Sequence, residues 1–124
     1  MLTAAITCYS LYASAQEMTN NEKIQQVLMI SSTESLPMDQ LSWLNNCLDR
    51  CIVLPITSIA SSITVGSVSD LTLLDKYGAI LSYDYEYDAS TFNPLKYMIN
   101  FYATVDQYFR IGDSEYVLKV NKKY

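Results

Sequence analysis

The 124 residues are enough for one domain with a sizeable core, and half of them are hydrophobic, which excludes a disordered chain. The formal charge is −5 with only eight Lys and Arg, so the clustered cations that bind nucleic acid are lacking. The chain contains no histidine, which removes the usual general base at neutral pH and the commonest metal ligand.

The first predicted element is an amphipathic helix over residues 2–17, where apolar side chains recur at helical spacing. Ala13-Ser14-Ala15 also resembles a signal-peptidase site, so secretion after cleavage near Ala15 is the alternative. The residues before that site contain no Lys or Arg, and threonines and serines interrupt their apolar run. No stretch of the chain has the length of a membrane span. We therefore expect a protein that stays inside the cell or within a virus particle.

Two further helices are predicted, over about 21–31 and 37–51. Thr19 and Glu22 fit a capping box at the start of the first, and a proline opens the second. Leucines at spacings of three and four give the second helix an apolar stripe. Trp43 lies on the flank of that stripe, and we interpret it as a partly buried edge residue.

The three cysteines predict free thiols in a reducing environment. Cys47 and Cys51 lie four positions apart on the predicted helix, where Cβ atoms are about 5–6 Å apart, farther than a disulfide allows. With Cys8 they make an odd number, and no histidine completes a zinc site. Reduced cysteines are typical of intracellular proteins.

From Ile52 onward the sequence predicts strands. Residues 52–59 and 62–65 are rich in β-branched side chains, and Pro55 predicts that the first strand is a sheet edge or bends at that residue. Gly66 marks a turn. Residues 68–78 fit either a short helix or a hairpin, and the pattern does not decide between them.

The last two predicted strands alternate in polarity. Residues 79–87 are predicted to place tyrosines on one face and acids on the other. Residues 98–121 predict a hairpin, with a strand to residue 111, a turn at Gly112-Asp113-Ser114 and a returning strand. We therefore predict a single α+β domain, residues 1–124, with N-terminal helices packed on a C-terminal antiparallel sheet.

Eleven tyrosines supply the candidate interface. Tyrosine is enriched at interfaces and is also a good strand former, and both interpretations stay open. The acidic ladder of this segment, Asp84, Glu86 and Asp88, is expected to be solvated, or to pair with the C-terminal lysines of a neighbouring subunit. The expected interface residues are Tyr83, Asp84, Tyr85, Glu86, Tyr87, Tyr102 and Tyr108.

The function predicted from these features is that of a non-enzymatic subunit of a larger protein assembly. Its partners are expected to be other protein subunits, in a homo- or hetero-oligomer, with no nucleic acid and no membrane. A virus or phage particle, with its connector, adaptor or tail-assembly components, is the expected setting. No residue is assigned a catalytic, cofactor-binding or metal-binding role. The alternative is a small-molecule-binding α+β domain with an aromatic pocket lined by Tyr83, Tyr85, Phe101 and Phe109.

Overall fold

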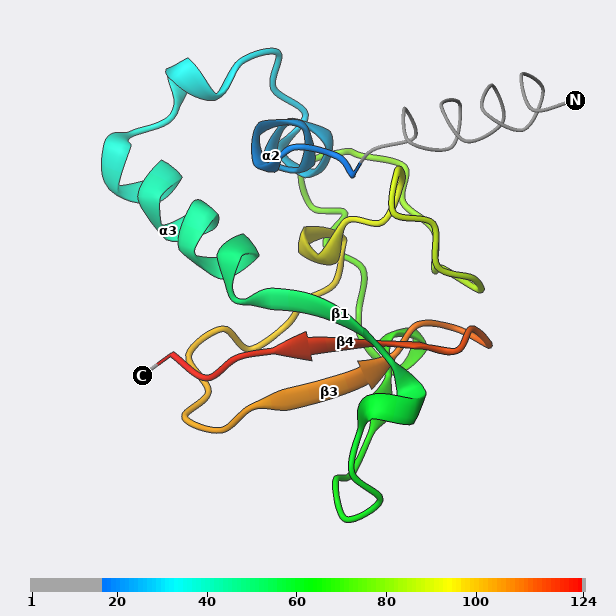
Figure 1. Ribbon diagram of the computed structural model, residues 1–124. Coiled ribbons are helices and arrows are strands. Elements are labelled where there is room, and N and C mark those ends of the chain that lie inside the picture. The colour runs from blue at the N-terminus through cyan, green and yellow to red at the C-terminus, as the bar shows by residue number, and fades with distance from the viewer. Residues whose placement is uncertain (1–16, 124) are drawn as a thin grey trace, which may run out of the picture.

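The computed structural model describes residues 17–123, and in these residues two α-helices lie over one face of a sheet (Figure 1). Helix α2 spans Asn20–Leu28 and helix α3 spans Met38–Asp49. The strands are β1 (Cys51–Pro55), β2 (Gly66–Ser67), β3 (Gln107–Arg110) and β4 (Tyr116–Val120). The helix predicted over residues 2–17 lies outside the described residues.

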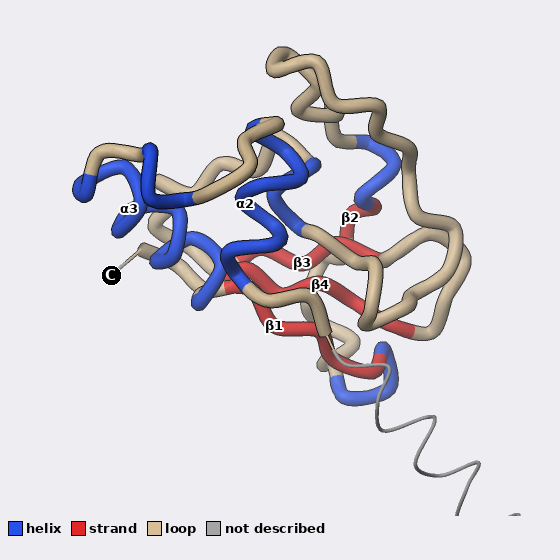
Figure 2. Tube along the Cα trace, turned by 90° about the horizontal axis from the view of Figure 1, so that it is seen from above, coloured by secondary structure: helices blue, strands red, loops and turns tan. Residues whose placement is uncertain are grey.

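The strands of residues 17–123 form a mixed sheet in the order β1-β4-β3-β2, which Figure 2 shows from above. β4 pairs antiparallel with both β1 and β3, whereas β2 runs parallel to β3 over two residues. The predicted α+β fold, the C-terminal hairpin and the edge position of the strand that contains Pro55 are confirmed. β1, β4 and β3 pair antiparallel as predicted, and the short parallel pairing of β2 with β3 makes the sheet as a whole mixed.

The two predicted helices form where their local signals place them. The Thr19 hydroxyl accepts a hydrogen bond from the Glu22 amide, and the Glu22 carboxylate accepts one from the Thr19 amide, so the capping box is confirmed. Ile24 and Val27 of α2 pack against Leu48 of α3 and Leu95. A second apolar cluster joins the sheet to the segment of residues 92–97. Its buried members are Val68, Phe92, Tyr97, Ile111, Leu118 and Val120.

The strand predicted over residues 79–87 is wrong. This segment bends at residues 85–86 and pairs with no strand of the described chain, and hydrogen bonds from other segments fix its path instead. The Tyr83 hydroxyl donates to the Leu71 carbonyl at 2.7 Å, and the Asp113 amide donates to the Tyr85 carbonyl at 2.8 Å. The segment in which tyrosines alternate with acids is therefore a loop that contacts the turn between β3 and β4.

The other long strands are shorter than predicted. In the segment predicted as a strand from residue 98 to 111, only β3 pairs, because the Asn100 side chain accepts from the Tyr102 amide and turns the chain. Residues 62–65 form no strand, and Gly66, predicted in a turn, belongs to β2. Residues 68–78 form neither predicted alternative: a 3₁₀ turn spans Val68–Asp70, and a tight turn ends at Gly78.

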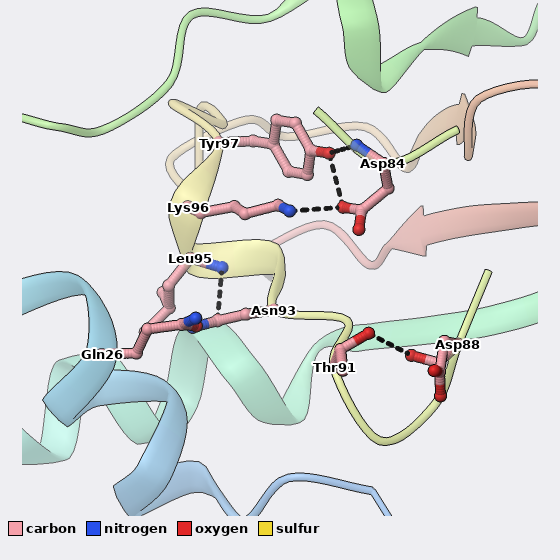
Figure 3. Close-up of polar contacts among 8 residues, drawn as sticks. All are labelled: Gln26, Asp84, Asp88, Thr91, Asn93, Leu95, Lys96 and Tyr97. Atoms are coloured by element: carbon pink, nitrogen blue, oxygen red, sulfur yellow. Dashed lines mark hydrogen bonds and ion pairs between the residues drawn. The ribbon is translucent and has the colours of Figure 1, made fainter. Parts of the chain in front are cut away.

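Asn93 joins α2 to the segment that precedes β3 (Figure 3). Its side chain is fully buried. The Nδ2 group donates to the Lys23 carbonyl at 2.9 Å and to Gln26 Oε1 at 2.8 Å, while Oδ1 accepts from the Leu95 amide at 3.1 Å. One buried amide thus satisfies groups from two segments about 70 positions apart in the sequence.

Replacing Asn93 with Ala is expected to lower the free energy of unfolding by about 2–3 kcal/mol, because buried backbone groups lose their partners. Urea denaturation followed by far-UV circular dichroism measures the change. The matched control is Asn100→Ala, which removes an exposed asparagine whose Oδ1 also accepts from an amide. Equal losses in the two variants would contradict the role assigned to burial.

Candidate functional site

Trp43 of α3 and Tyr102 of the loop before β3 form a stacked aromatic pair. Their ring centroids lie 4.7 Å apart and the ring planes are inclined by 23°. Trp43 is half-buried, as predicted for an edge residue, whereas 65% of Tyr102 is exposed. An offset stack of this kind fixes two large rings at the surface with little freedom left to lose on binding.

Two cations flank the stacked pair. The Arg50 guanidinium carbon lies 5.6 Å from the Trp43 ring centroid, and Lys123 Nζ lies 5.5 Å from Trp43 and 4.8 Å from Tyr102. These distances are within the range of cation–π attraction. We call Trp43, Arg50, Tyr102 and Lys123 the aromatic surface.

Arg50 holds the parts of the aromatic surface together. It follows the last residue of α3, and its guanidinium donates to the Phe101 carbonyl at 2.9 Å and to the Asn121 carbonyl at 3.4 Å. The Asn121 amide donates in turn to the Arg50 carbonyl at 2.9 Å. The end of α3, the loop that carries Tyr102 and the segment that carries Lys123 are therefore fastened at one point.

The chemistry of the aromatic surface suits protein recognition. Trp, Tyr and Arg are the residues that most often dominate the binding energy of protein interfaces. The sequence did not single out Trp43 or Arg50 as functional. The available signal was their spacing of seven, which puts both on the same face of the helix predicted over residues 37–51. Tyr102 and Lys123 come from distant segments, and no local pattern connects them to α3.

The predicted interface residues are not brought to one face. Tyr102 lies in the aromatic surface, and Tyr108 is half-buried beside Lys119, whose Nζ lies 5.8 Å from its ring. Glu86 is exposed, and Tyr85 is 74% exposed. The remaining three make internal contacts; they are Tyr83, Asp84 and Tyr87.

Asp84 belongs to a buried network (Figure 3). Lys96 Nζ lies 2.8 Å from Asp84 Oδ2, and the two side chains are 9% and 15% exposed, respectively. The Tyr97 hydroxyl donates to Asp84 Oδ2 at 2.6 Å and accepts from the Asp84 amide at 2.9 Å. The expected solvated ladder of Asp84, Glu86 and Asp88 is therefore wrong at Asp84, which anchors the loop to the core.

Burial, together with the hydrogen bond that it gives to Asp84, raises the pKa of Tyr97 well above its usual value near 10. The folded state therefore holds this proton more tightly than the unfolded chain. The stabilisation is fully present below about pH 10 and is lost as the pH rises through the higher pKa of the folded state.

We expect the native chain to be more stable than Tyr97→Phe by about 1–3 kcal/mol at pH 8, since the hydroxyl bonds to a charged group. The difference should narrow as the pH rises above 10. Urea denaturation of both chains between pH 8 and 11 measures it. Lysines titrate in the same pH range in both chains, so their contribution cancels when the unfolding free energy of the variant is subtracted from that of the native chain. A difference that does not change with pH would contradict the raised pKa of Tyr97.

The four residues predicted to line an aromatic pocket lie in different surroundings in the structure. Neither of two surface hollows found in residues 17–123 is lined by Tyr83, Tyr85, Phe101 or Phe109. Phe101 and Phe109 pack against the core with Tyr83. Tyr85 is turned to solvent.

The thiols are poor candidates for chemistry. Burial raises the pKa of Cys47, and it raises the pKa of Cys51 to about 12. Both cysteines are free, and they hold little thiolate at neutral pH. Within residues 17–123, no three His, Cys, Asp or Glu side chains gather where a metal ion could bind.

Comparison with models of protein families, with curated proteins and with solved structures finds no match to this chain. Among residues 17–123, no helix combines the length and the apolar character that crossing a bilayer demands. The function is therefore argued from the geometry of the residues alone.

Proposed function

We propose that this protein is a non-enzymatic subunit of a larger protein assembly and that the aromatic surface is one of its contacts with a neighbour. The observation that carries the proposal is the stack of Trp43 on Tyr102, with Arg50 and Lys123 beside it. A mostly exposed tyrosine held in place by a tryptophan is a preorganised anchor of the kind that interfaces use.

The neighbour we propose is a second copy of the chain, which offers the exposed carboxylate of Glu86. The aromatic surface is basic and adjoins Lys122, whereas the chain as a whole carries −5. Glu86 is exposed next to the exposed ring of Tyr85. A contact between two different patches is head-to-tail, and repeated contacts of this kind build rings or filaments.

The setting we propose is a virus or phage particle, where connector, adaptor and tail-assembly subunits make such repeated contacts. The support is the kind of chain: small, acidic, free of histidine and rich in tyrosine. Asp84 has no part in the proposed contact, because it is paired with Lys96 inside the subunit.

Sedimentation equilibrium of the purified chain tests the contact. Tyr102→Ala should weaken self-association by about 30-fold or more, because loss of a hot-spot side chain removes about 2 kcal/mol or more of binding. Tyr77→Ala is the matched control, since Tyr77 is an exposed tyrosine with its own lysine, Lys76, 5.2 Å from the ring centroid. This control should associate like the native chain. A native chain that stays monomeric at every concentration would overturn the proposal.

Charge reversal tests the acidic partner patch. Glu86→Lys should weaken association, and adding Lys123→Glu in the same chain should restore part of it, because the two residues are proposed to face each other across the contact. The native association should also weaken with added salt. Association unchanged by Glu86→Lys would exclude this patch while leaving the test of Tyr102 intact.

A further inference from the structure

β1 is at one edge of the sheet, and half of its backbone groups point away from β4. The Ile56 amide donates to the Glu115 carbonyl, and the Asn121 amide donates to the Arg50 carbonyl. In an antiparallel ladder the direction alternates, so the even-numbered residues of β1 bond to β4. The N–H and C=O groups of Cys51 and Val53 therefore face outward, and an edge of this kind accepts another segment of polypeptide.

A hollow of about 240 Å³ lies beside this edge, lined mostly by residues with apolar side chains together with Glu17 and Lys23. Two register partners of the sheet line it, the buried Leu118 and the half-buried Val53. Phe92 and Pro94, the two neighbours of the buried Asn93, line another part of the hollow. The hollow thus combines several apolar side chains with outward-facing backbone groups, a combination that suits a segment of polypeptide.

Residues 1–16 of the same chain have the right chemistry to occupy it, and the residue that follows them lies at the hollow. They contain no charged side chain, and eleven of the sixteen are apolar. Glu17, the first described residue, lines the hollow itself, so the segment of residues 1–16 joins the described chain at the site. Sixteen residues span up to about 50 Å when extended, several times the length of the five-residue β1.

We propose that apolar side chains from residues 1–16 occupy the hollow beside β1 in the same molecule and cover the outward edge of this strand. The segment would keep the backbone groups of Cys51 and Val53 from pairing with strands of other chains. Exposed sheet edges are prone to such pairing, and proteins commonly cover them. This inference is independent of the aromatic surface, which involves neither β1 nor the hollow.

Amide hydrogen exchange measured by NMR on the full chain tests the proposal. One variant carries Asp in place of four apolar residues, Ile6, Tyr9, Leu11 and Tyr12. The control carries Asp in place of four polar residues of the same segment, Thr3, Thr7, Ser10 and Ser14. The Cys51 and Val53 amides should exchange at least ten-fold faster in the apolar variant than in the native chain, and the control should resemble the native chain. The Leu54 amide, which faces β4, reports an intact sheet and should not change in either variant.

Three outcomes would overturn the proposal. Equal exchange of the Cys51 and Val53 amides in the native chain and the apolar variant would show that the segment does not cover the edge. A control as unprotected as the apolar variant would show that apolar side chains do not hold the segment. Protection that disappears when the native protein is diluted would assign the covering segment to a second copy.

Discussion

Gly112→Ala is expected to lower the free energy of unfolding by more than about 4 kcal/mol, which is an exceptional loss for a single residue. Gly112 begins the turn between β3 and β4, and its φ of +57° lies in the left-handed region. A Cβ atom at this position would collide with the backbone of Tyr85, at its Cα, carbonyl carbon and carbonyl oxygen. Since backbone rather than a flexible side chain is struck, the loop of residues 84–88 would have to leave the hairpin.

Gly78→Ala is the matched control. Gly78 also has a positive φ, +93°, but no atom lies within 4 Å of the Cβ that alanine would add. Only the backbone penalty applies there, about 1–2 kcal/mol. Urea denaturation of the two variants compares them directly. Similar losses would mean that the close approach of Tyr85 to the hairpin contributes nothing beyond the conformational preference of glycine.

The second large effect is expected from Asp84→Asn. The substitution leaves the Lys96 ammonium buried without its anionic partner, and breaking such a pair destabilises proteins by about 3–5 kcal/mol. The amide keeps a hydrogen-bonding group next to the Tyr97 hydroxyl, so the loss is assigned mainly to the unpaired charge. The free energy of unfolding at pH 7, from denaturant titration, measures it.

A double variant separates the unpaired charge from the lost contact. Adding Lys96→Met to Asp84→Asn removes the buried cation, and replacing both members of a buried ion pair is often close to neutral. The double variant should therefore be more stable than Asp84→Asn alone. Losses that simply add would show that the two side chains do not interact energetically.

The parts of the fold that follow from local signals could be predicted. The capping box at Thr19 and Glu22 and the turn residues after Ile111 each specify structure within a few positions, and the structure has α2 and the hairpin there. The α+β class follows from helical periodicity early in the chain and alternation later in it.

The predictions that were wrong concern segments whose structure depends on residues far away in the sequence. Residues 79–87 alternate like a strand, yet Leu71, Lys96 and Tyr97 hold this segment as an unpaired loop. The two-residue strand β2 exists only because β3 lies beside it. Alternation of side chains reports an extended backbone and does not report whether a pairing partner is present.

The candidate site was only partly accessible from sequence. Tyr102 was expected at an interface because it lies in a tyrosine-rich segment. Its partner Trp43 comes 59 positions earlier, and Arg50 fastens the two segments through backbone carbonyls that no motif records. The aromatic surface is therefore a product of tertiary structure.

The most direct test of the proposed contact uses Trp43, the single tryptophan of the chain, as its own reporter. Quenching of its fluorescence by acrylamide is measured as the protein concentration rises, beside the molar mass from light scattering. If neighbouring subunits meet at the aromatic surface, quenching falls over the same concentration range in which the mass increases. A mass that increases while quenching stays constant, or a mass that never exceeds that of one chain, would contradict the account.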